Sequence, residues 1–143
     1  MTTQEWLERG WLLNDEIEEL RATKLNIWER CTRSTPTYST EPGGGNPDPH
    51  KFESLAAFGE AIDQRCAELA DVSREIFTAI CRLPLDENNN KYRQLLIYRY
   101  LNFYTFERIA VVMDYSWRHI HRLHAEALRA MDVVIECHTA EAL

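Results

Sequence analysis

The sequence predicts an all-α protein, and three features of the chain favour that fold class. Apolar residues recur at helical spacings of three and four along two long segments, residues 3–33 and 52–83. Glycine and proline gather between these segments, where they would end a helix. The chain then changes to short helical patterns separated by capping residues, from about residue 91 onward.

The first predicted helix covers about residues 3–33. Its apolar seam repeats at alternating steps of four and three, with Lys24 as a polar interruption, and consists of Leu13, Ile17, Leu20, Ile27 and Cys31. Gly10 should weaken the first third of this helix by about 1 kcal/mol relative to alanine.

Residues 34–51 are predicted to form a long, flexible loop. Four prolines and the triplet Gly43–Gly45 forbid a continuous helix or strand there. A loop of this length is uncommon inside a compact domain, so it is either functional or a tolerated connection, and we favour the second interpretation.

The second long helix is predicted over residues 52–83, before Pro84. Its seam holds Gly59 and Ser73 and the apolar residues Phe52, Leu55, Ile62, Cys66, Leu69, Ile76, Ile80 and Leu83. Two long helices with one seam each should fold back as an antiparallel, coiled-coil-like hairpin over residues 1–85. Such a hairpin has little core, so it should pack against the C-terminal part of the chain or against a second copy, as a homodimer.

Charge and composition limit the function. The formal net charge is −7, but residues 91–131 carry 7 Lys or Arg against 3 Asp or Glu, whereas residues 1–90 carry 9 against 17. A basic segment within an acidic chain suits contact with phosphates. No run approaches the roughly 20 apolar residues of a membrane span, and no signal pattern opens the chain, so we expect a cytoplasmic protein without a membrane partner.

Residues 86–138 are predicted to be a separate module, followed by a tail at 139–143. A polar turn over residues 86–90 leads into a helix at 91–101, whose buried face should hold Leu95, Leu96 and Leu101. Thr105 is a plausible N-cap for a short helix at 106–113.

The next helix should begin after a tight turn. Asp114 suits a left-handed backbone, and Ser116 then caps a helix from Trp117 to about Ile135. Ile120, Leu123 and Ala127 should face inward. Two helices joined by so short a turn form a helix-turn-helix.

Residues 105–131, TFERIAVVMDYSWRHIHRLHAEALRAM, resemble region 4 of the sigma-70 family without a gap. The matching features are the Thr and acidic residue that open the first helix, Ile-Ala, the serine cap, the hydrophobe four residues after it and the closing Ala-Leu-Arg. On looser patterns, nearly the whole chain resembles small phage-encoded transcription regulators of the late-gene activator type (ArpU/RinA-like).

The resemblance implies that the helix after Ser116 enters the major groove of duplex DNA. Carried over residue by residue, it implies that Trp117, Arg118, His121 and Arg122 face base edges and that Ser116 and His119 lie nearer the backbone. Further basic residues are candidates for phosphate contacts or intramolecular pairs: Lys91, Arg93, Arg99, Arg108 and Arg129. The implied function is a regulator that acts at promoters with host RNA polymerase.

The sequence also departs from the sigma pattern. Arg118 stands where sigma factors usually carry an acidic residue, Trp117 stands where they carry a small or basic one, and Asp114 replaces the usual turn glycine. The housekeeping promoter element is therefore not the expected target. No other sigma region is recognisable, which favours an adaptor or activator.

Other functions are less well supported by the sequence. His119, His121 and His124, or Cys137 with His138, could be read as metal ligands, but the usual partner spacing is absent, and we expect no cofactor. The three histidines at 119–124 are instead predicted to lie on a polar, partly basic helix surface. No phosphate-binding loop, nucleophile elbow or paired acid motif indicates an enzyme. Two alternatives stay open: a phage small-terminase-type DNA-packaging protein, and a protein-only regulator that binds RNA polymerase. The four cysteines lack CxxC spacing, three of them fall where a buried small hydrophobe would fit, and we expect reduced core thiols.

Overall fold

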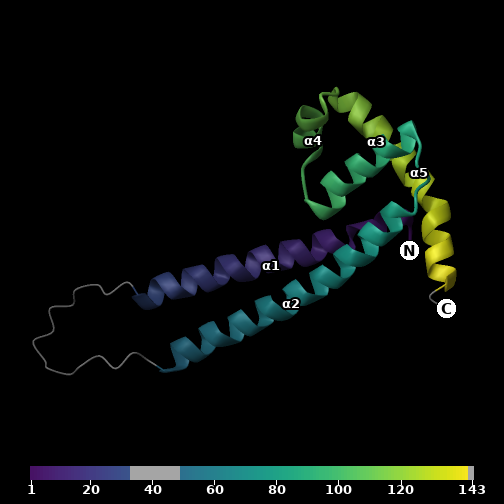
Figure 1. Cartoon of the computed structure of the whole chain (residues 1–143). Helices are drawn as coiled ribbons and strands as arrows, with labels where there is room; N and C mark the ends of the chain where they lie inside the picture. The colour runs from purple at the N-terminus through teal and green to yellow at the C-terminus, as the bar shows by residue number, and fades with distance from the viewer. Residues whose placement is uncertain (33–48, 142–143) are drawn as a thin grey trace, which may run out of the picture. The chain divides into compact units, whose positions relative to one another are not determined.

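The structure is a computed structural model that describes residues 1–32 and 49–141, and all regular structure in these residues is helical (Figure 1). The helices are α1 (Thr3–Thr32), α2 (Pro49–Cys81), α3 (Glu87–Leu96), α4 (Phe106–Met113) and α5 (Trp117–Glu141). A π-helical turn, Ile97–Leu101, follows α3 directly. None of the described helices combines the length and the apolar character that crossing a membrane requires.

The chain divides into two compact units, and α1 and α2 each contribute residues to both. The first unit contains Met1–Leu12 and the chain from Leu69 onward, and the second contains Leu13–Glu68. The division predicted between residues 85 and 86 falls inside the first unit.

The first unit has a continuous hydrophobic core. The members below 2% exposure come from α1, α2, α3, the π-helical turn, α4 and α5: Leu7, Ile76, Ala79, Ile80, Leu95, Leu96, Tyr100, Ile109, Ile120, Ala127 and Met131. The α5 members repeat at helical spacing, so one stripe of that helix faces the core and the opposite stripe faces solvent. Each large side chain removed from water in this way contributes about 1.5–3 kcal/mol of transfer free energy.

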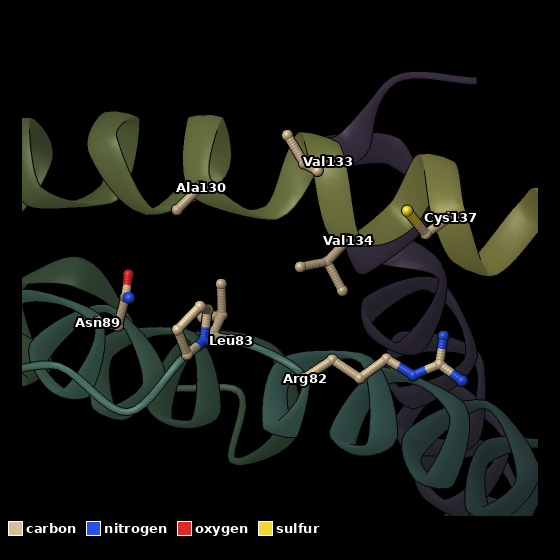
Figure 2. Close-up of a pocket in the computed structure, with 8 residues that line it drawn as sticks. Arg82, Leu83, Asn89, Ala130, Val133, Val134 and Cys137 are labelled. Carbon is tan, nitrogen blue, oxygen red and sulfur yellow. The ribbon is translucent and has the colours of Figure 1, made fainter.

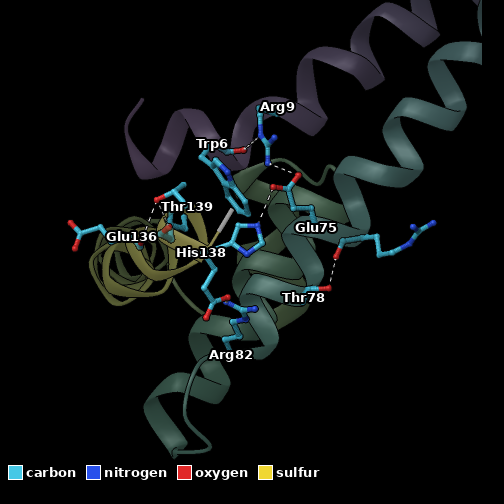
Figure 3. Close-up of polar contacts among 11 residues, drawn as sticks. Trp6, Arg9, Glu75, Thr78, Arg82, Glu136, His138 and Thr139 are labelled. Carbon is cyan, nitrogen blue, oxygen red and sulfur yellow. Dashed lines mark hydrogen bonds and ion pairs between the residues drawn. The ribbon is translucent and has the colours of Figure 1, made fainter. Parts of the chain in front are cut away.

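The first turns of α1 are part of this core, although the predicted seam of that helix began only at Leu13. Trp6 and Leu7 are buried, and the Trp6 ring contacts the ring of His138 on α5 edge-on, with 5.7 Å between centroids. Figure 3 shows the polar contacts beside it, in which Glu75 pairs with Arg9 at 3.2 Å and with His138 Nε2 at 3.1 Å. The start of α1 is therefore held to α2 and α5 by both apolar and charged contacts.

Within the second unit, residues 13–32 of α1 run antiparallel to residues 49–68 of α2 (Figure 1). Arg65 joins the two helices by an ion pair to Glu16 at 3.0 Å and also pairs with Glu68 on its own helix at 2.8 Å. Few apolar side chains are buried here, namely Ile17, Leu55 and Ile62. Phe52, predicted to belong to the seam, is 54% exposed.

Three helix boundaries in the structure differ from the predicted ones. α2 begins at Pro49, inside the predicted loop 34–51, because proline suits the first position of a helix, where no backbone N–H is needed. The rest of that loop, residues 34–48, lies outside the described residues. α3 begins at Glu87, inside the predicted polar turn, with Asp86 as its N-cap. α5 continues to Glu141, so part of the predicted tail is helical.

The prediction that the cysteines lie in the core is wrong. All four are free thiols, as expected, but none of them lies in the core: Cys31 and Cys66 are half-buried, and Cys81 and Cys137 are exposed. Cys81 follows the buried Ile80 directly, so it lies off the apolar stripe of α2.

Candidate nucleic-acid interface

Local hydrogen bonds fix both ends of α4. The hydroxyl of Thr105 accepts a hydrogen bond from the Arg108 N–H at 3.2 Å, which caps the helix at its start. At its end Asp114 is left-handed (φ 57°, ψ 47°), and the N–H groups of Tyr115 and Asp114 donate to the carbonyls of Ala110 (3.0 Å) and Val111 (3.3 Å). This is the Schellman arrangement, which usually relies on glycine. Asp114 fills the glycine position because aspartate tolerates a left-handed backbone.

α5 follows after one further cap. The Ser116 hydroxyl accepts a hydrogen bond from the His119 N–H at 3.1 Å, and the helix begins at Trp117. Ile120, Leu123 and Ala127 are buried, which fixes the rotation of α5 about its axis. The opposite side of its first turns must then point outward.

The predicted site residues after Asp114 occupy this outward side. Five of them are exposed: Ser116, Trp117, Arg118, His119 and Arg122. By helical periodicity Arg118 and Arg122 form a central stripe, because they are four residues apart. His121 differs from the others because it is only half exposed.

Two ring pairs flank the arginine stripe. On one flank the rings of Tyr115 and His119 stack nearly parallel, with centroids 4.5 Å apart and planes at 4°. On the other flank the Trp117 and His121 rings lie 3.9 Å apart with planes at 54°. The N-terminal surface of α5 thus presents guanidinium groups between two aromatic edges. We call this surface, made of residues 115–119, 121 and 122, the α5 face.

The arginines of the α5 face lack internal partners. Arg118 and Arg122 form no ion pair with any residue in the described part of the chain, and the first turn of α5 holds no acidic side chain. The N-terminal end of a helix carries partial positive charge, so a guanidinium there is disfavoured in the isolated protein by a few tenths to about 1 kcal/mol. An external anion would remove that cost.

The remaining predicted arginines divide into two kinds. Arg93 donates to the Leu83 carbonyl at 2.8 Å, and Arg99 donates to the Tyr104 carbonyl at 3.0 Å, so both hold parts of the first unit together. Arg108 is exposed, and its guanidinium lies over the Tyr104 ring at 3.9 Å. Of the five basic candidates for phosphate contacts, Lys91, Arg108 and Arg129 are exposed, whereas Arg93 and Arg99 are half-buried.

His124 corrects the sequence prediction that the three α5 histidines lie together on a polar surface. Its side chain is 8% exposed and its Nε2 shares a hydrogen bond of 2.6 Å with the Tyr100 hydroxyl. Burial, and then the positive charge of Arg99, lowers the pKa of His124 to about 4, and burial raises the pKa of Tyr100. The sequence does carry a signal for the burial of His124: it lies on the apolar stripe of α5, four residues after Ile120 and three before Ala127.

Two further features of the described residues bear on other kinds of site. Among the described residues, no three His, Cys, Asp or Glu side chains come together as metal ligands. A groove of about 500 Å³ lies along the C-terminal half of α5 (Figure 2), and its lining includes Leu83, Val134 and Cys137. None of the predicted site residues lines that groove.

Comparison with known proteins adds no relative. No family model matches this chain, and neither a curated protein nor a solved structure matches it.

Proposed function

We propose that this protein is a sequence-specific DNA-binding transcription regulator, that α4 and α5 form its sigma-region-4-like helix-turn-helix, and that the α5 face enters the major groove. One observation carries this proposal: Arg118 and Arg122 are exposed, lie one helical turn apart on α5 and form no ion pair with the described residues, and Arg118 lies in the first turn of the helix. Arginine in such a position can bind guanine through two hydrogen bonds, and exposed aromatic edges suit thymine methyl groups.

The other basic side chains supply the contacts that do not depend on sequence. Arg108, at the start of α4, is exposed, forms no ion pair with a carboxylate of the described residues and suits a phosphate oxygen. The acidic composition of residues 1–90 disfavours spreading along DNA, because phosphates repel it. Binding should therefore centre on the module that contains α4 and α5.

We further propose that the protein acts at promoters with host RNA polymerase, as a phage or prophage regulator. This part of the proposal rests on the resemblance of residues 105–131 to sigma region 4. It also rests on the lack of any other sigma-like region that would let the chain melt DNA by itself.

A second copy of the chain is the proposed partner of the second unit. Leu25, Trp28 and Phe52 are each more than half exposed, so this unit leaves large apolar side chains in water. Arg21 and Lys24 flank Leu25, Trp28 and Ile62 around a groove of about 330 Å³. Two antiparallel pairs could bury these groups against each other. A monomer in light scattering at micromolar concentration would contradict this part of the proposal.

Selection of bound duplexes from a random library tests the DNA-binding proposal. We expect enrichment of one sequence motif, and the affinity for that motif should fall steeply with salt, with a log–log slope of about 0.9 for each phosphate contacted. A motif with two-fold symmetry indicates a dimer, and an asymmetric motif indicates a sigma-like monomer.

Two results would contradict the proposal. Absence of enrichment, with no binding to duplex DNA at low salt, would favour the protein-only regulator. Ring-like oligomers that select a packaging site rather than a promoter would favour the terminase-type alternative.

A further inference from the structure

The exposed ring of Trp117 rests on a stack of side chains. Trp117 is 56% exposed at the first position of α5, and the ring of His121 lies 3.9 Å from it. The other neighbour of His121 is Phe106, the first residue of α4, with centroids 4.5 Å apart. The Trp117 indole is therefore supported by a residue of its own helix and, through it, by α4.

The stack continues within the first unit, toward α1. The Arg99 guanidinium lies over the Phe106 ring at 4.1 Å and also over the Trp11 ring at 4.6 Å. The Trp11 Nε1–H donates to the Arg99 carbonyl at 2.8 Å. Because Arg99 is held in this way from two sides, Phe106 and His121 have a rigid base.

His121 is poorly placed to read a base itself. Its Nε2 atom is buried and has no hydrogen-bond partner in the described residues. A buried nitrogen that lies between two rings cannot reach a base edge unless the stack opens. His119, on the opposite flank, stacks on Tyr115 but is exposed, so it stays accessible to DNA.

We propose that Trp117 determines specificity by covering the 5-methyl group of one thymine, and that His121 is a positioning residue that holds the indole in place. The inference rests on the proposed DNA-binding function. An indole fixed before binding loses little freedom when DNA arrives, so the contact with the methyl group is retained as affinity and specificity. The flat, apolar and exposed face of Trp117 matches the one apolar group that distinguishes thymine in the major groove.

Deoxyuridine substitution tests the contact with the methyl group. In the duplex selected by the wild-type protein, each thymine is replaced in turn by deoxyuridine, which removes only that methyl. We expect one position at which affinity falls about fourfold, the effect of exposing one methyl-sized apolar group. Trp117→Ala should bind the selected and the substituted duplex equally.

Variants of His121 separate positioning from base contact. His121→Phe keeps a ring between Trp117 and Phe106 and should keep the deoxyuridine effect, whereas His121→Ala should lose most of it. His138→Phe is the matched control outside the α5 face, where the ring contacts Trp6, and it should leave the effect unchanged. If His121→Phe loses the effect as completely as His121→Ala does, a ring nitrogen of His121 contacts the base and the inference is wrong.

A measurement without DNA checks the same role. The indole N–H resonance of Trp117, assigned by its loss in Trp117→Phe, should lie away from the position of a solvent-exposed indole. It should keep that position in His121→Phe and move to the exposed position in His121→Ala. An unchanged resonance in His121→Ala would show that His121 does not hold the ring.

The outcomes distinguish this inference from the proposed function. If the wild-type protein selects a motif but no deoxyuridine lowers its affinity, the inference fails and the DNA-binding function stands. If the protein selects no sequence, the function fails and the inference fails with it.

Discussion

The arginines of the two long helices and those of the α5 face differ in what they contact. On α1 and α2, Arg9, Arg21, Arg65 and Arg74 each form an ion pair with a carboxylate of the same protein, and Arg30, in the last turn of α1, is the exception among the described residues. On α5, Arg118, Arg122 and Arg129 form none with the described residues. The same residue type therefore serves the fold in one region, while in the other its charge is left available to a partner.

The unpaired arginines of the α5 face should produce the largest effect. Arg118→Ala combined with Arg122→Ala should abolish sequence preference, because each guanidinium paired with guanine contributes about 1–3 kcal/mol of discrimination. The expected loss is about 100-fold for the selected duplex relative to random DNA, measured by competition binding. The melting temperature should stay equal or rise slightly, because the positive charge of Arg118 leaves the first turn of a helix and neither arginine has an ion-pair partner in the described residues.

A matched control removes the same charge elsewhere. Arg21→Ala combined with Arg74→Ala also deletes two guanidinium groups, but both come from exposed ion pairs on α1 and α2. This control should keep full sequence preference. Full specific binding by the Arg118/Arg122 double variant would overturn the assignment of the α5 face.

Two histidines of α5 differ in the same way, since one is exposed and the other is part of the core. His119 is exposed on the α5 face, whereas His124 is buried and hydrogen-bonded to Tyr100. Because the pKa of His124 is about 4 in the folded protein and about 6.5 when unfolded, the unfolded chain binds the proton more readily. Stability should be complete above pH 6.5 and fall as the pH decreases from about 6.5 to 4, by roughly 2–3 kcal/mol.

Urea unfolding at pH 7.5 and pH 4.5 measures this effect. His124→Gln should be less stable at pH 7.5 but should lose less stability between the two pH values than the wild-type protein does. His119→Gln is the control and should change neither. An equal pH dependence in His124→Gln and the wild-type protein would show that another group causes the acid sensitivity.

The parts of this fold that could be predicted from sequence are those that local chemistry determines. The structure has α4 at residues 106–113, as predicted, because Thr105 and Asp114 fix its ends through hydrogen bonds to neighbouring residues. The start of α3 was missed because Asn88, Asn89 and Asn90 carry no apolar periodicity, although Asp86 is a usable cap.

The parts that could not be predicted depend on contacts between distant residues. Pairing of Tyr100 with His124, and of Trp6 with His138, requires the packed unit. The same limit applies to the candidate site. The exposed residues Ser116 to His119 could be placed by counting from the cap, but the half-buried state of His121 depends on Phe106, fifteen positions away in sequence.

The smallest effect should come from an ion-paired arginine of the second unit. It tests whether the paired arginines of α1 and α2 stabilise the fold without contributing to DNA binding. Arg65→Ala removes the ion pairs to Glu16 and Glu68, which are exposed to solvent and screened by salt. We expect a small decrease in melting temperature at low salt that disappears at high salt, with unchanged affinity for the selected duplex. Arg65→Lys keeps the charge but cannot reach both carboxylates with a planar group, so it should recover only part of the loss. A change in DNA specificity in Arg65→Ala would mean that the second unit also contributes to recognition, and the division between structural and DNA-binding arginines would no longer hold.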